Sequence, residues 1–194
     1  MENKILFKAP IEISARHIHL NQKNFIKLFG KEAVLKPVAA LSQKGQFASD
    51  SFVTLLSKDK TKQIKLRVLG PFRAFSQIEL SSSDAYMLGY KIPIRLSGNI
   101  DDAPKIKVAT PLGAISVAAI VPQRHLHIPK SLAQKYGLKD SQPVACEIKG
   151  CRKLIFKNII VRIDDEAVLA LHLDTDEGNA AGVIEKARGQ ILKS

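Results

Sequence analysis

Short segments in which apolar and polar residues alternate with a period of two dominate the chain. Residues 64–69 read Ile-Lys-Leu-Arg-Val-Leu, as expected for a strand with one buried face. Five further segments have the same character: Ile92–Leu96, Lys105–Val108, Ala114–Val121, Val144–Ile148 and Ile155–Ile163. Many short strands predict β-barrels or a sandwich rather than an α/β sheet.

Helical signals are few and short. Capping residues predict four helices: residues 22–29 after Asn21 and before Gly30; 85–89 after Ser83 or Asp84; 130–136 opened by Pro129 and closed by Gly137; and 179–188. They are too short to form a helical layer, so we expect them to cap the ends of β structures.

The composition is that of an ordinary globular protein. With 194 residues, 45% hydrophobic, the chain suits one large domain or two small ones. Its longest apolar runs, such as residues 115–122, are too short to span a bilayer, and its first residues lack the apolar core of a signal peptide. We therefore expect a cytoplasmic protein without a membrane partner. Cys146 and Cys151 cannot build a disulfide framework.

The net charge of +12 admits nucleic acid, an anionic membrane surface or small polyanions as partners. The lysines are scattered, and the 6% of aromatic residues form no stacking series. Nucleic acid is therefore the weaker interpretation. A lineage with lysine-rich proteins would also explain the excess.

A weak internal repeat links two distant segments. Ala15-Arg-His-Ile-His-Leu20 recurs as Gln123-Arg-His-Leu-His-Ile128, and each copy precedes a short predicted helix that ends in glycine. The segments further downstream do not match. We interpret the repeat as two related strand-to-helix corners, and not as a full duplication.

Four of the five histidines lie in this repeat. Residues i and i+2 of a strand project to one face, so His17 with His19, and His125 with His127, can bind one metal ion per pair. Imidazole ligands favour zinc, or iron, cobalt or manganese, over calcium and magnesium. The alternative is that the histidines are structural.

His172 is the natural third ligand for one pair. The acidic residues that follow it, Asp174, Asp176 and Glu177, could support a metal site. Asp176 and Glu177 could equally cap the helix predicted near Asn179.

Three further features are candidates for a site. Arg73 follows a Gly-Pro turn at a strand end and suits the binding of phosphate or carboxylate. Glu79 alternates with Gln77 and could reach a metal ion. The polar loop 41–46, Leu-Ser-Gln-Lys-Gly-Gln, resembles a loop that covers a substrate, although by itself it is only a turn.

Five strings in order resemble the phosphate propanoyltransferase family, the phosphotransacylases of bacterial propanediol utilisation. They are Ser14-Ala-Arg-His-Ile-His-Leu20, Leu41-Ser-Gln-Lys-Gly-Gln-Phe47, Arg67-Val-Leu-Gly-Pro-Phe-Arg73, Arg124-His-Leu-His127 and His172-Leu-Asp-Thr-Asp-Glu-Gly-Asn-Ala180. The resemblance implies a zinc-dependent acyltransferase that interconverts a short-chain acyl-coenzyme A (propanoyl or acetyl) and phosphate with an acyl phosphate and coenzyme A.

The resemblance also implies the fold: two β-barrel domains capped by short α-helices. One barrel would comprise residues 1–15 and 123–194, the other residues 16–122, with the active site at their interface. A homodimer is the favoured oligomeric state.

Residue roles follow from matching positions. Two zinc ions per chain would be held by His17, His19 and Glu79 and by His125, His127 and His172, and Arg73 would bind phosphate as the catalytic arginine. Coenzyme A would contact the matching residues, namely Ser14, Arg67, Leu69, Tyr86, His172 and Asn179.

The departures from the family pattern are few. Lys44 stands in place of a usual proline, Gly178 in place of a usual alanine, and Thr110 begins a turn where glycine is common. No microcompartment-targeting peptide is evident. The rival functions are a zinc hydrolase on the same scaffold and a basic protein that binds nucleic acid.

Overall fold

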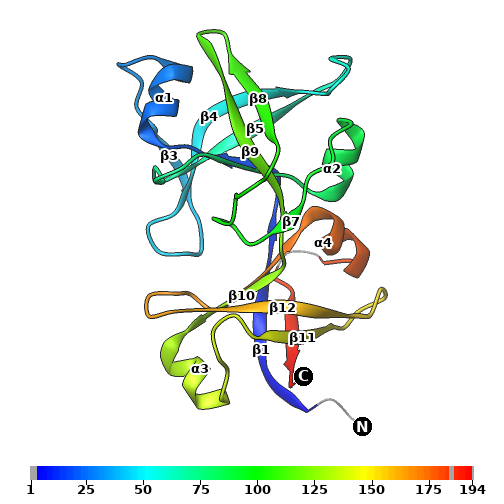
Figure 1. The fold of residues 1–194 in the computed structure, drawn as a ribbon. Helices are drawn as coiled ribbons and strands as arrows, with labels where there is room; N and C mark the ends of the chain where they lie inside the picture. Colours follow the sequence, from blue (N-terminus) through cyan, green and yellow to red (C-terminus); the bar gives the residue numbers. More distant parts are fainter. Residues whose placement is uncertain (1–3, 184–185, 194) are drawn as a thin grey trace. The chain divides into compact units, whose positions relative to one another are not determined.

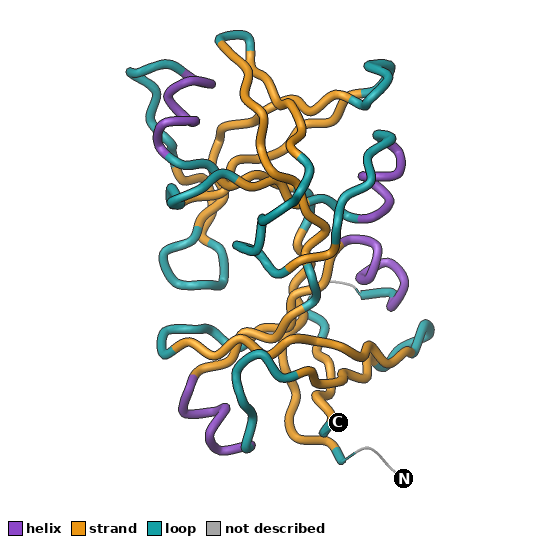
Figure 2. The backbone as a smooth tube through the Cα atoms, in the orientation of Figure 1, coloured by secondary structure: helices purple, strands orange, loops and turns teal. Residues whose placement is uncertain are grey.

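The computed structural model describes residues 4–183 and 186–193 and divides into two compact units. The first comprises Met1–Ser14, Ser42–Lys44 and Gln123–Ser194, and the second Ala15–Leu41 and Gly45–Pro122. Strands dominate both units, and the helices are short (Figure 2). The expected mainly β fold of two barrels with short helices is confirmed.

A closed six-stranded barrel forms the first unit (Figure 1). Its strands follow one another around the barrel in the order β1 (Ile5–Ser14), β13 (Ala170–Asp174), β10 (His125–Pro129), β12 (Leu154–Asp164), β11 (Pro143–Ile148) and β14 (Arg188–Leu192). Apolar side chains such as Leu126, Ile128 and Ile191 fill its core and are fully buried.

The second unit also contains a ring of six strands. The order is β9 (Gly113–Pro122), β6 (Gln77–Glu79), β2 (His17–His19), β5 (Gln63–Gly70), β4 (Phe47–Leu56) and β8 (Lys105–Thr110), and β8 closes the ring by pairing with β9. Two short strands lie outside the ring, with β3 (Pro37–Ala40) on β4 and β7 (Ile94–Arg95) on β9.

The two rings have the same pairing pattern. Around the first ring, starting from β1, and around the second, starting from β9, the successive strand pairs have the same orientations. They are parallel, antiparallel, parallel and then antiparallel three times. In this correspondence β10 matches β2 and β13 matches β6. The structural repeat is therefore wider than the two corners that the sequence indicated, because the same pairing pattern covers both rings.

The duplicated halves exchange a strand. The first half, β1 to β8, and the second half, β9 to β14, each begin with a strand that completes the barrel of the other half. This connectivity explains why β1 belongs with the C-terminal part of the chain. It also explains why each His-x-His strand directly follows the strand that its half contributes to the other barrel.

Two helices have the predicted bounds. Helix α1 spans Gln22–Phe29, with the Asn21 side chain accepting a hydrogen bond from the backbone N–H of Asn24, and it ends at Gly30. Helix α3 spans Lys130–Tyr136 and ends at Gly137, which adopts the left-handed conformation that glycine tolerates. Pro129 is its N-cap.

The other two helices differ from the prediction. Helix α2 (Ser82–Met87) starts at the N-cap Ser81, and not at Ser83 or Asp84. Helix α4 spans Thr175–Ala181 and ends at Gly182, so the predicted helix 179–188 was wrong, and its positions 184 and 185 lie outside the described residues. Along the described ranges no helix has the length and apolar character needed to cross a membrane.

Candidate functional site

The second barrel brings His17, His19 and Glu79 together. Strand β2 carries both histidines at positions i and i+2, and Glu79 of β6 lies directly opposite His17 in the antiparallel pair. All three residues are buried, with at most 6% of each exposed. The cluster therefore lies within the protein and not on its surface.

Hydrogen bonding orients the histidine rings of this cluster. The Nδ1 atom of His17 lies 2.8 Å from the backbone oxygen of Ala15 and donates to it. The Nε2 atom of His17 lies 3.1 Å from Nε2 of His19 and 3.5 Å from Oε2 of Glu79. Three potential metal ligands thus converge.

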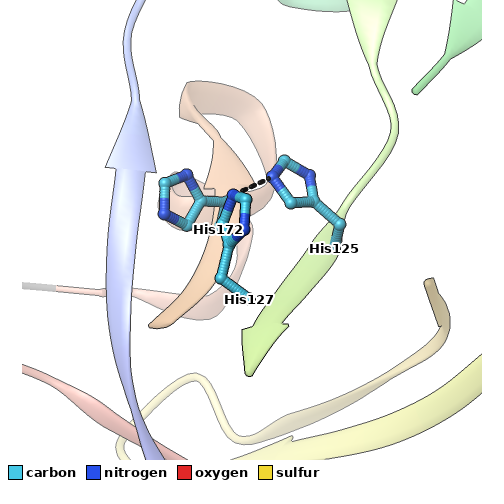
Figure 3. Close-up of side chains that lie close together, drawn as sticks. All are labelled: His125, His127 and His172. Carbon is cyan, nitrogen blue, oxygen red and sulfur yellow. Dashed lines mark hydrogen bonds between the residues drawn. The ribbon is translucent and has the colours of Figure 1, made fainter. Parts of the chain in front are cut away.

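The first barrel repeats this arrangement with a different third residue. His125 and His127 project from β10, and His172 of β13 lies opposite His125. The three rings face one another (Figure 3), with Nε2 of His125 3.1 Å from Nε2 of His127. Nδ1 of His125 donates to the backbone oxygen of Gln123 at 2.9 Å. The ring centroids are 4.8–5.0 Å apart.

The environment keeps one imidazole of each cluster, His19 and His127, neutral. Burial, with the neighbouring His17 and Arg73, lowers the pKa of His19 to about 3. Burial, with the neighbouring His125, His172 and Arg162, lowers that of His127 to about 3 as well. Neutral imidazole is the form that binds metals.

The pKa of Glu79 reflects opposing influences. Burial alone would raise it, but His17, His19, a hydrogen bond with Ser97 and Arg73 together lower it. Glu79 is therefore ionised at neutral pH and can act as an anionic ligand.

The donor sets fit a transition metal. In each cluster one potential ligand atom per residue lies within 4.8 Å of the others. The two Nε2 atoms of each His-x-His pair lie 3.1 Å apart, a separation that two ligands of one ion can have. Two or three imidazoles with at most one carboxylate match the preferences of zinc and its neighbours, and not those of calcium.

Arg73 lies beside the second-barrel cluster. Its guanidinium donates a 2.9 Å hydrogen bond to Oγ of Ser97. The Gln77 side-chain amide donates to the same Oγ at 3.0 Å and to Oε1 of Glu79 at 2.6 Å. A polar chain thus links Arg73 to Glu79. Ser97 had no signal in the sequence, because it lies in the irregular segment after β7.

The residues expected to contact coenzyme A lie on several elements. Ser14 ends β1, Leu69 pairs with His19 in the sheet, Asn179 is exposed on α4, and Tyr86 on α2 is 88% exposed. Arg67 lies opposite His17 in the parallel pair of β2 and β5.

Arg67 already has protein partners. Its guanidinium stacks 4.3 Å above the ring centroid of Phe52 and donates to the backbone oxygen of Ser49 at 2.6 Å. The cation and its stacked ring form a fixed, partly exposed positive group.

The polar loop 41–46 is anchored and not free. Both ends of the Gln43 side-chain amide bond the backbone of Val168, at 3.0 and 3.2 Å, and Gln43 is buried. Ser42 Oγ donates to Glu12 at 2.5 Å. Residues 42–44 therefore belong to the first barrel. We call this anchored segment, residues 42–44, the strap.

The acidic residues after His172 hold helix α4. Asp174 and Glu177 form a capping box, and Oε1 of Glu177 pairs with Nε of Arg124 at 2.7 Å. The equivalent pair in the other barrel is Arg16 with Asp84 of α2, at 3.3 Å. The capping interpretation of Glu177 is thus correct, and the arginine before each His-x-His strand contacts the helix that follows the third cluster residue.

Comparison with known proteins gives consistent matches. The family model for phosphate propanoyltransferase matches residues 10–184. Proteins named phosphate propanoyltransferase from Levilactobacillus brevis and Lachnoclostridium phytofermentans are each 40% identical to the chain. The alignments cover 96% of this chain and 90% and 86% of theirs. A protein of the same name from Thermotoga maritima is 36% identical over 92% of this chain and 87% of its own length. The chain belongs to the phosphate propanoyltransferase family.

Three positions where the motif strings were expected to depart from the family pattern have local partners. Lys44, on the anchored loop, forms a 2.8 Å ion pair with Glu166. Gly178 lies under Ile13: a Cβ there would come within 2.5 Å of the Ile13 Cδ1 atom. Thr110 Oγ1 donates to the backbone oxygen of Leu28 near the end of α1.

Proposed function

We propose that this protein is a zinc-dependent phosphate acyltransferase. It interconverts a short-chain acyl-coenzyme A, propanoyl or acetyl, and inorganic phosphate with the acyl phosphate and coenzyme A. Family membership supports the reaction. The observation that carries the proposal is the cluster of His17, His19 and Glu79 with Arg73 beside it.

The proposed cofactor is two zinc ions per chain, one in each cluster. A tetrahedral zinc ion with nitrogen ligands at about 2.0–2.1 Å places neighbouring ligand atoms roughly 3.3 Å apart. The ligand atoms in the second-barrel cluster are 3.1 and 3.5 Å apart, and the paired Nε2 atoms of the other cluster 3.1 Å. Bound zinc would supply Lewis-acid stabilisation of negative charge.

Arg73 is the proposed phosphate-binding residue. Its permanently charged guanidinium is held by Ser97 and suits bidentate contact with phosphate oxygens. By holding phosphate in place it lowers the entropic cost of bringing the two substrates together. The proposed coenzyme A contacts are Ser14, Arg67, Leu69, Tyr86, His172 and Asn179.

The proposed reaction is direct attack. A phosphate oxygen attacks the thioester carbonyl carbon, the new C–O bond forms, the C–S bond breaks, and coenzyme A leaves as the thiolate. No acyl group is transferred to the protein, and both anionic substrates are attracted by the net charge of +12.

The test is Arg73→Ala, with Arg73→Lys as the matched control. We expect R73A to lower phosphate-dependent release of coenzyme A from propanoyl-coenzyme A by at least about a hundredfold, with zinc content near two per chain. R73K keeps the charge but loses the planar guanidinium with its paired N–H donors, so its activity should lie between those of the wild type and R73A. Zinc loss in R73A would assign Arg73 a structural role. Phosphate-independent release of coenzyme A by the wild type would instead select a hydrolase.

A further inference from the structure

Three side chains form a row across adjacent strands of the first barrel. His125 on β10 lies opposite His172 on β13, and His172 lies opposite Glu12 on β1. Side chains of directly opposite residues on neighbouring strands, when they project from the same face of the sheet, are close enough to interact. Glu12 is thus the next residue in line after the third member of the histidine cluster.

The equivalent row in the second barrel has the carboxylate at a different place. There His17 lies opposite Glu79, and Glu79 lies opposite Ile120 on β9. Each row therefore contains one carboxylate, as the third cluster residue in one barrel and one strand further on in the other. In the first barrel the third cluster position is a histidine, His172, and the carboxylate of Glu12 lies beside it on the next strand.

Glu12 contacts His172 directly. Its Oε2 atom lies 3.2 Å from Nε2 of His172, a buried atom that makes no well-aligned hydrogen bond. Oε2 of Glu12 also accepts the 2.5 Å hydrogen bond from Ser42. The anchored Gln43 amide, which bonds Val168, lies 3.4 Å from the Ser42 hydroxyl. The carboxylate oxygen that faces His172 is therefore also held by Ser42.

We propose that Glu12 is a positioning residue for the His125–His127–His172 metal site, with Ser42 holding its carboxylate. By accepting the Nε2 proton of His172 it fixes the ring orientation and leaves Nδ1 unprotonated for a metal ion. Glu12 is not itself a ligand, because the set of donor atoms that lie within 4.8 Å of one another contains only the three histidines. The inference rests on the proposed zinc binding.

The test measures zinc affinity by competition with a chromophoric chelator, using the full chain and zinc alone. Outer contacts of this kind change metal affinity by about 10–100-fold. We expect Glu12→Ala to weaken one of two zinc sites by that factor and leave the other unchanged. Glu12→Gln, which keeps an acceptor but loses the charge, should weaken the same site less, and Ser42→Ala less again. His172→Ala identifies the affected site, because E12A should have little further effect in that background.

Glu166→Gln is the matched control. Glu166 is a carboxylate on the same unit that pairs with Lys44 of the strap and belongs to neither histidine cluster. It should leave both affinities unchanged. If both sites of E12A keep the wild-type zinc affinity, the inference about Glu12 is overturned while the proposed zinc dependence stands. The same holds if both sites are weakened equally and the unfolding midpoint is lower. A wild-type chain that binds no zinc would overturn the proposed zinc dependence and the inference together.

Discussion

At the scale of single residues, neither cysteine is suited to carry an acyl group. Cys146 is fully buried in the first barrel core, and burial raises the pKa of its thiol to about 12. Because the thiolate is the nucleophile, such a thiol is unreactive at neutral pH. Cys151 is exposed in the turn between β11 and β12 and belongs to neither cluster.

We therefore predict that no acyl-enzyme accumulates. Incubation with labelled propanoyl-coenzyme A in the absence of phosphate should leave the intact chain at its unmodified mass, and Cys151→Ser should keep the wild-type kcat. The control is the same mixture with phosphate, in which labelled acyl phosphate appears. A stable adduct on the chain without phosphate, released when phosphate is added, would contradict direct attack.

The sequence predicted individual site residues when their partner was close in sequence or repeated. His17 with His19, and His125 with His127, follow from the i, i+2 geometry of a strand. Glu79 and His172 were candidates from the sequence, but only the family resemblance assigned each to a pair, because strand pairing brings them opposite the histidines. Contacts such as Ser97 with Arg73 and Glu12 with His172 join distant segments and had no local signal.

At the scale of elements, Gly178 lies in the middle of helix α4 against Ile13 of β1. Glycine costs up to about 1 kcal/mol relative to alanine in a helix, yet a Cβ at this position would crowd Ile13. We predict that Gly178→Ala gives no gain in the free energy of unfolding in the wild-type chain. After Ile13→Val, which removes the crowding methyl, the same change should stabilise the protein by about 0.5–1 kcal/mol.

Urea unfolding of the four proteins in this cycle measures the coupling. Ala180→Gly is the control, because Ala180 is exposed on the same helix. It should lose up to about 1 kcal/mol regardless of the residue at position 13. Additive effects of G178A and I13V would mean that the contact does not explain the glycine.

Helix ends were predictable where one capping residue stood alone and not where several competed. Asn21 and Gly137 mark the ends of α1 and α3 correctly. Before α2 three serines and an aspartate are consecutive, and the first serine is the N-cap. Before α4 the capping box of Asp174 and Glu177 places the start four residues earlier than predicted, and Gly182 in a left-handed conformation ends the helix.

At the scale of the whole molecule, local patterns indicated β structure, but they could not reveal how strands are shared. The sequence repeat is confined to six residues around each His-x-His motif, while the pairing repeat covers every strand of both rings. A barrel core accepts many combinations of apolar residues of suitable size. Equivalent strands can therefore diverge in sequence while their register is kept by the alternation.

The strand exchange predicts a specific circular permutant. The two ends of the described chain lie side by side, since the backbone N–H of Lys193 donates to the oxygen of Lys4 at 3.0 Å. A short linker there, with new ends in the exposed turn between Pro111 and Leu112, gives a chain that starts with β9 and ends with β8. This chain has the same order of equivalent strands as the natural one, so every pairing is kept. Chain ends in exposed turns are tolerated.

We expect this permutant to unfold in one cooperative transition and to bind as much zinc as the natural chain. The matched control carries the same linker but opens the chain between Ala118 and Ala119, in the buried middle of β9, where the pairing with β6 and β8 is interrupted. It should be unfolded or strongly destabilised because the second barrel can no longer close. Circular dichroism during thermal unfolding compares the two. Equal stability of both permutants would mean that closure of the barrel through an unbroken β9 does not stabilise the fold.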